Sequence, residues 1–290
     1  MVTGGRDESD NNGQFFPSFF FLSKTSPGLR FWLCIMLAAV QSGDAKKLAG
    51  LMRQDPGFKV NVAQNGYGFT LLHFACQRDS RSAVIPLLLA HPGIDINVKN
   101  TDGETPFYYA CQFGLPSCVR EMVKDSRVKV NEPDNIGYTP LWWAAACGYL
   151  DVIEWLIASG REMDLGKPGD VDKTDAIGVA KNHGRTEAVT LLERFKNNPE
   201  ETRRAMRVEL GCLDDVAAEM FALVVFVSDG LLQINDTTTP SPATRYFSIA
   251  AQLPLELQMV LCHRVVGSDK EIIPGKDSEV AFKELAGKLW

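Results

Sequence analysis

The chain has 290 residues, which is long enough for one or two domains with a hydrophobic core. Its 45% apolar and 23% charged residues are ordinary for a soluble globular protein. The net charge of -6 at pH 7 disfavours non-specific binding to nucleic acid or anionic lipid, because no basic field is concentrated along the chain. We therefore expect neither nucleic acid nor a membrane among its partners.

The cysteines give information about redox chemistry and compartment. All seven are scattered through the chain, and no two form a C-x-x-C pair, which disfavours a disulfide framework and a zinc site. Cys76, Cys111 and Cys147 each follow an alanine, so we interpret them as small apolar core residues in a reducing compartment. The sequence predicts a protein of the cytoplasm or the nucleus.

The first strongly apolar run is LRFWLCIMLAAVQSG, at residues 29–43. It resembles the apolar core of a secretory signal peptide, and a secreted or membrane-tethered protein is one alternative. Acidic residues precede the run, however, and it is too short to span a bilayer. We favour a different role, in which residues 31–40 form the first helix of a terminal repeat. Residues 1–30 then form a disordered N-terminal tail.

An internal repeat occupies the middle of the chain. Three segments align in phase: GFTLLHFACQ at 68–77, GETPFYYACQFG at 103–114 and GYTPLWWAAACG at 137–148. Their threonines recur at intervals of 35 and 34 residues, at Thr70, Thr105 and Thr139. A second mark recurs in the same phase, an asparagine that ends the segments FKVN, IDIN and VKVN, at Asn61, Asn97 and Asn131. Such phased marks indicate one structural unit that is used several times.

The period and the pattern T-P-L-H-x-A resemble the ankyrin family. A unit of about 34 residues, with two short helices and a turn, is typical of that family. The threonine can cap the first helix of each unit, and the following proline suits the first helical turn. The resemblance implies an all-α ankyrin-repeat solenoid, built from helix-turn-helix units, with a helical module at its C-terminus.

Two degenerate units flank the three clear ones. Ala39 with Gly43 upstream, and Ala180 with Gly184 downstream, match the alanine and glycine positions of the inner repeats. We therefore expect about five repeats over residues 31–197. The rest of the chain divides into a helical cap at 198–235, a linker at 236–245 and a helical C-terminal module at 246–290.

A solenoid offers a long concave face and a row of turn tips, which suits recognition better than catalysis. In the ankyrin family, residues around the turn before the threonine and after the alanines commonly contact partners. The resemblance thus implies partner-binding roles for Tyr67, Phe69, Gln77, Arg78, Asp102, Glu104, Gln112, Phe113, Ile136, Tyr138, Asn182 and His183, and for the matching positions Ala146, Cys147, Asp172 and Thr174.

The aromatic and aliphatic residues of this set predict a stripe that could anchor a partner, namely Tyr67, Phe69, Phe113, Ile136 and Tyr138. The alternative is that some of them tuck against adjacent turns and extend the core. The same ambiguity holds for Trp142 and Trp143, which are either core or contact surface.

The histidine of the ankyrin pattern is kept only as His73. In the family this histidine ties neighbouring turns by hydrogen bonds, so the resemblance implies a structural role. Tyr108 and Trp142 take its place in the next two repeats, which predicts altered packing there.

The C-terminal third loses the repeat marks. Residues 220–227 are apolar on every side and predict a buried helix or strand. LPLELQMVL, from residue 253, resembles the L-P-x-E-L start of an F-box, which docks onto a cullin ubiquitin ligase; some viral ankyrin proteins end in a similar tail. The resemblance implies adaptor docking through Leu253, Pro254, Glu256, Leu257 and Leu261. The alternative is a plain helical capping module.

No catalytic constellation is visible in the sequence. Gly275-Lys276 lacks the rest of a phosphate loop, and the four histidines have no metal-ligand spacing. We therefore predict a non-catalytic protein without cofactor or metal that binds another protein through its repeats. The alternative function is the substrate-recognition subunit of a cullin-type ubiquitin ligase.

Overall fold

The structure, a computed structural model, describes residues 27–166, 174–230, 232, 242–266, 273, 277–278 and 280–283. Every regular element within these residues is a helix. The chain divides into two compact units, Met1–Pro199 and Glu200–Trp290.

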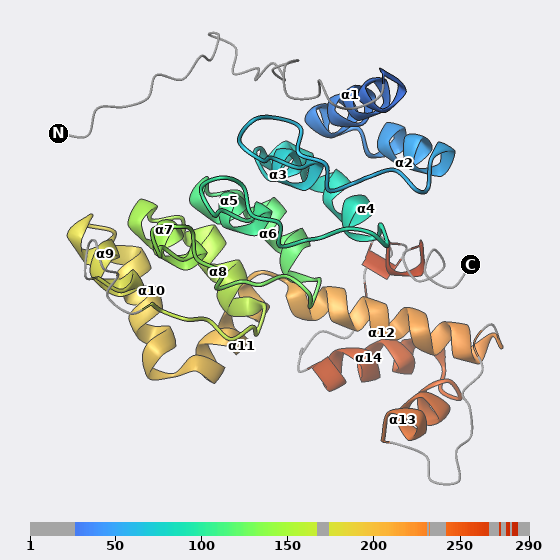
Figure 1. Ribbon diagram of the computed structural model, residues 1–290. Helices are drawn as coiled ribbons and strands as arrows, with labels where there is room; N and C mark the ends of the chain where they lie inside the picture. Colours follow the sequence, from blue (N-terminus) through green and yellow to red (C-terminus); the bar gives the residue numbers. More distant parts are fainter. Residues whose placement is uncertain are drawn as a thin grey trace. The chain divides into compact units, whose positions relative to one another are not determined.

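The first unit is a stack of five helical pairs. The pairs are α1 (Pro27–Ser42) with α2 (Ala45–Gln54), α3 (Leu71–Ala75) with η2 (Asp79–Val84) and α4 (Ile85–Leu89), α5 (Pro106–Gln112) with α6 (Pro116–Val123), α7 (Pro140–Cys147) with α8 (Leu150–Ala158), and α9 (Ala176–Asn182) with α10 (Thr186–Asn197). The first helices pack on one another in chain order, and so do the second helices, which gives two parallel rows (Figure 1). This is the all-α repeat solenoid that the sequence predicts.

The apolar run near the N-terminus belongs to this stack. Leu33, Met36 and Leu37 are buried on α1, which packs against α2 and α3. Residues 27–30 are helical, although we expected them in the tail, and the rest of that predicted tail, 1–26, lies outside the described residues. In the part of the chain that the structure describes, no helix combines the length and the apolar character needed to cross a membrane.

A tight turn precedes each of α3, α5 and α7, and one side-chain oxygen holds it closed. The acceptor is Asn65, Asn100 or Asp134, and its Oδ1 lies 3.0, 2.9 or 2.9 Å from the backbone nitrogen four residues further on. Gly103 completes the second of these turns with a φ of +80°, and a side chain there would collide with Asn135. Each acceptor stands five residues before the repeat's threonine, a phased signal that our sequence analysis missed.

The predicted caps are present on α5 and α7. Thr105 Oγ1 accepts from the backbone nitrogen of Tyr108 at 3.1 Å, and Thr139 Oγ1 accepts from that of Trp142 at 3.2 Å. A proline occupies the first turn of each helix, where its missing N–H costs no hydrogen bond. The sequence pattern therefore fixes where both helices begin.

His73 performs the tying role that the resemblance implies. Its Nδ1 accepts from the backbone nitrogen of Thr70 at 3.2 Å, so the ring proton is on Nε2, which donates to the carbonyl oxygen of Glu104 at 3.2 Å. The ring is fully buried, and burial lowers its pKa to about 4. A neutral imidazole thus joins the starts of two adjacent repeats.

The phased asparagines form a ladder between repeats. Asn97 Nδ2 donates to the carbonyl oxygen of Arg127 at 3.0 Å, and Asn97 Oδ1 accepts from the backbone nitrogen of Lys129 at 2.9 Å. Asn61 and Asn131 make the same pair of bonds to the repeat that follows each of them. Each of these asparagine side chains thus binds a carbonyl oxygen and a backbone nitrogen in the loop of the next repeat. This shared role is the physical reason for the repeated asparagine.

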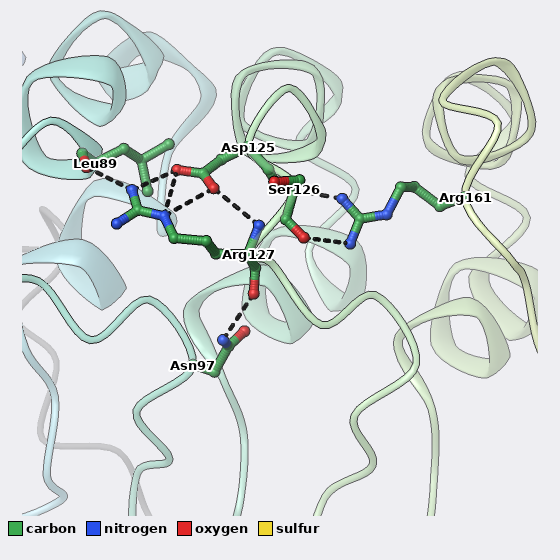
Figure 2. A network of polar contacts seen from close by, with 6 residues as sticks. All are labelled: Leu89, Asn97, Asp125, Ser126, Arg127 and Arg161. Atoms are coloured by element: carbon green, nitrogen blue, oxygen red, sulfur yellow. Dashed lines mark hydrogen bonds and ion pairs between the residues drawn. The ribbon is translucent and has the colours of Figure 1, made fainter.

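Two arginines, 34 residues apart, bind carbonyls near the end of the preceding repeat's second helix (Figure 2). Arg127 Nη2 donates to the carbonyl oxygen of Leu89 at 2.8 Å, while Asp125 pairs with the same guanidinium. Arg161 donates to the carbonyl oxygens of Asp125 and Ser126 at 3.2 and 3.0 Å. Cations are favourable at helix C-termini, where carbonyls lack helical partners. These arginines were not among the residues predicted from the sequence, although they recur at the 34-residue spacing of the repeats.

The second unit has a small core of its own. Its helices are α11 (Pro199–Glu209), which begins at the boundary, α12 (Cys212–Ser228), α13 (Pro242–Ala250) and α14 (Leu255–Val266). Phe221 and Val224 on α12 pack in one buried cluster with Ala250 and Cys262, so the apolar run 220–227 is a buried helix. The cap assigned to 198–235 stays a prediction. Of the predicted linker, 236–241 lie outside the described residues and 242–245 are helical.

Replacing Asn97 by alanine removes two inter-repeat hydrogen bonds. We expect the free energy of unfolding of the first unit to fall by about 1–2 kcal/mol. Urea unfolding followed by circular dichroism measures this loss. Thr101→Ala is the matched control, because its exposed hydroxyl makes no such bond. Equal midpoints for the two variants would show that the ladder adds no stability.

His73 predicts a pH dependence of stability. Its pKa is about 4 in the folded chain, below its ordinary value of 6.5, so the unfolded chain binds the proton more readily between these values. The stability is therefore complete above pH 6.5 and is lost as the pH falls towards 4, by about 3 kcal/mol. We expect the stability difference between the natural chain and His73→Gln to shrink by this amount. A difference that does not change with pH would contradict the buried neutral ring.

Candidate partner-binding surface

The residues implied as partner contacts differ in exposure. Tyr67, Phe113 and Ile136 are large apolar residues that are 61%, 50% and 59% exposed. The polar residues Arg78, Asp102, Asn182 and His183 are also exposed, whereas Gln77, Glu104, Gln112, Tyr138, Cys147 and Thr174 are partly buried, and Ala146 is buried. Asp172 lies outside the described residues.

Phe69 lies in the core, although the resemblance implied a contact role. Its side chain is only 8% exposed. The ring packs 5.3 Å from the His73 ring and edge-on against Tyr109 at 5.2 Å. Tyr109 belongs to the next repeat, so Phe69 fills the junction between two repeats and leaves little area for a partner.

Rings of the third and fourth repeats gather along the first helices. Tyr109 packs on Phe113 at 4.7 Å, and Tyr138 stacks on Trp142 at 4.2 Å. Trp143 meets Trp142 edge-on at 5.3 Å. Both tryptophans are partly buried, so each supplies packing and also accessible area. We call these five residues, Tyr109, Phe113, Tyr138, Trp142 and Trp143, the aromatic face.

Tyr108 connects the aromatic face to the scaffold. Its hydroxyl donates to Asp134 Oδ2 at 2.5 Å and accepts a hydrogen bond from Trp143 Nε1. Tyr108 stands where the ankyrin pattern has histidine, and its longer side chain still reaches the next repeat. Burial raises the pKa of the hydroxyl, so it stays protonated. This geometry is the altered packing that the sequence predicts at this position.

Carboxylates lie beside the aromatic face. Glu104 Oε2 accepts from Asn100 Nδ2 at 2.8 Å, and the Glu104 carboxyl is partly buried. Burial raises its pKa, and the negative charges of Asp102 and Asp134 raise it further. Among the described residues, none of these three carboxylates makes an ion pair.

The residues implied for adaptor docking lie at the start of α14. Pro254, Glu256 and Leu257 are exposed, whereas Leu253 is partly buried and Leu261 packs against the core of the second unit. Leu255, which the F-box resemblance did not single out, is 53% exposed. Four consecutive residues at the start of α14, 254–257, are thus exposed, and they include only part of the predicted set.

The described residues contain no group of three or more His, Cys, Asp or Glu side chains that could hold a metal ion. Burial raises the pKa of the Cys76, Cys111 and Cys118 thiols, which keeps them protonated and weakly nucleophilic.

The repeats of this chain are similar to those of known proteins. A family model for ankyrin repeats, in three copies, matches residues 72–168, and the chain therefore carries ankyrin repeats. Human SMC5-SMC6 complex localization factor protein 1 is 38% identical over 97 residues, and mouse neurogenic locus notch homolog protein 1 is 29% identical over 102 residues. Putative ankyrin repeat protein FPV031 of fowlpox virus is 32% identical over 164 residues.

These matches cover only part of each protein. They span 32%, 35% and 55% of this chain, and 9%, 4% and 43% of the human, mouse and viral proteins. The similarity is therefore a similarity of repeats, and the relatives' activities do not transfer with it.

Removing the Tyr108 hydroxyl should leave Asp134 Oδ2 and Trp143 Nε1 without that partner. We expect Tyr108→Phe to lower the free energy of unfolding by about 1–3 kcal/mol, and to alter the fluorescence of the tryptophans. Urea unfolding followed by fluorescence measures both effects. Tyr67→Phe removes an exposed hydroxyl and should change neither. Identical behaviour of the two variants would contradict the assigned link.

Proposed function

We propose that this chain, which carries ankyrin repeats over residues 72–168, is a non-catalytic scaffold that binds another protein. The partner docks on the aromatic face and on the neighbouring turn tips. One observation carries the proposal: Tyr67, Phe113 and Ile136, which come from three consecutive repeats, each expose half or more of a large apolar side chain.

The position of these side chains supports a recognition role. Tyr67 and Ile136 occupy equivalent places in their turns, one residue before a glycine with a positive φ, and Phe113 follows the end of α5. Large apolar side chains that are exposed in three consecutive repeats offer several anchor points to one partner, and aromatic residues are common anchors of binding hot spots. Neighbouring polar residues such as Gln77 and Gln112 would supply a polar rim.

The matched human protein gives limited further support. It is named a localization factor of the SMC5-SMC6 complex. Bringing proteins together is a task that suits a repeat array, so this similarity favours a recruiting role here. The cysteines are all free, which favours the cytoplasm or the nucleus as the place where this chain works.

A second candidate function is the substrate-recognition subunit of a cullin-type ubiquitin ligase. The observation that favours it is the exposure of Leu257, at 52%, beside exposed Pro254 and Glu256. The ankyrin match ends at residue 168, so it gives no support to an F-box in α14. In this proposal the repeats hold the target while α14 holds the adaptor.

Affinity purification from cells with mass spectrometry separates the two candidates. We expect Ile136→Arg to reduce recovery of the partner at least about tenfold, because it places a charge in an apolar contact. Gln54→Arg is the matched control, since it adds the same charge on exposed α2, away from the face. Leu257→Asp should leave the partner's recovery unchanged.

The alternative function predicts a different result. A cullin and its adaptor would be recovered with the natural chain and with Ile136→Arg, and would be lost with Leu257→Asp. If Ile136→Arg and Gln54→Arg recover the same proteins in equal amounts, docking on the turn tips beside the aromatic face is overturned.

A further inference from the structure

The strongest unexplained feature is the position of Glu104 beside the aromatic face. Glu104 stands immediately before its repeat's capping threonine, as Phe69 does in the preceding repeat. Phe69 packs edge-on against Tyr109, and Trp143 is the residue equivalent to Tyr109 in the next repeat. Repeat equivalence therefore predicts that the Glu104 side chain lies next to Trp143. The effect of Glu104 on the pKa of Tyr108, whose hydroxyl binds Trp143, agrees with this placement.

No described residue of the repeats forms an ion pair with the charge at this position. Glu104 has only neutral hydrogen-bond partners, the amides of Asn100 and Gln112. The acidic groups Asp102 and Asp134 act on it unfavourably. A partly buried carboxylate of this kind is stabilised when a cation approaches it.

Asp134 differs from Glu104 because its hydrogen-bonding capacity is already used. Its Oδ1 accepts from three backbone nitrogens, and its Oδ2 accepts from the Tyr108 hydroxyl. It contributes negative charge to the surface, but it has little capacity left to bind a new donor. Of the two carboxylates that act on Tyr108, Glu104 is therefore the one that can still accept a new donor.

The rings of the aromatic face suit a cationic ligand as well. A lysine or arginine head group is attracted to the face of an aromatic ring, and its aliphatic stem packs on such rings. The chain already makes one such contact, between Arg120 and the Trp155 ring at 5.2 Å. Phosphate groups of a nucleic acid or a lipid would instead meet the negative charges of Glu104, Asp102 and Asp134.

We propose that the partner presents a basic peptide to the aromatic face, and that Glu104 binds a lysine or arginine side chain held between Tyr109 and Trp143. This inference rests on the proposed function, because it names the class of segment that the scaffold recognises. It assigns Glu104 the role of selecting positive charge, while Phe113 and Ile136 supply apolar contact.

The test pans a random-peptide display library against the full chain and against four variants, one of which is Ile136→Arg of the proposed docking surface. Glu104→Lys reverses the charge. Glu104→Gln removes the charge but keeps a side-chain oxygen that can accept a hydrogen bond from Asn100. Glu162→Lys is the matched control, because it reverses an exposed acidic residue in a loop after α8. Circular dichroism verifies that each variant is folded, and fluorescence anisotropy measures the affinities of the enriched peptides.

We expect the peptides enriched on the natural chain to contain an excess of lysine and arginine. Their affinity should fall about tenfold or more with Glu104→Gln and further with Glu104→Lys, while Glu162→Lys leaves it unchanged. Added salt should weaken binding to the natural chain more than binding to Glu104→Gln.

Two other outcomes distinguish a failure of this inference from a failure of the proposed function. The enriched peptides could be neutral or acidic, bind Glu104→Lys as well as the natural chain, and fail to bind Ile136→Arg. This result would overturn the basic specificity and leave the proposed scaffold function standing. If nothing is enriched on the natural chain over Ile136→Arg, both the basic specificity and the proposed docking surface, the aromatic face with its neighbouring turn tips, are overturned.

Discussion

The fold depends on side chains that bind the backbone of the next repeat. Asn97 supplies both a donor and an acceptor to the loop that follows the next pair of helices, and Asn61 and Asn131 repeat this arrangement. Short helices cannot hold themselves in water, so these neighbour contacts and the buried helix faces must hold them together. Stability is then shared between adjacent repeats, as in other arrays of stacked units.

The surface and the scaffold meet at Tyr108. A histidine at this place would tie one turn to the next, as His73 does with the carbonyl of Glu104. The tyrosine keeps that tie through Asp134 and extends it to the indole of Trp143. Tyr108, which replaces the histidine of the repeat pattern, therefore both joins two repeats and orients Trp143 of the aromatic face.

The sequence predicts those parts of the structure in which a residue binds a partner at a fixed distance along the chain and the arrangement recurs in each repeat. Thr105, Thr139 and the asparagine marks have partners at fixed offsets, so their roles follow from spacing. Tyr67 and Phe69 are two residues apart, yet one is 61% and the other 8% exposed, because Tyr109 of the next repeat covers only Phe69. No such partner can be assigned before the repeats are stacked. The C-terminal third has no period, so its packing was beyond prediction from the sequence.

The hydrogen bond between Tyr108 and Trp143 has a consequence for how the aromatic face meets a ligand. A free indole on a surface samples several rotamers and loses that freedom on association. Here the ring is tethered to the scaffold by its nitrogen and packed edge-on against Trp142 before any ligand arrives. The entropy of ordering this side chain is lost during folding, so Trp143 itself adds little to the ordering entropy lost on association.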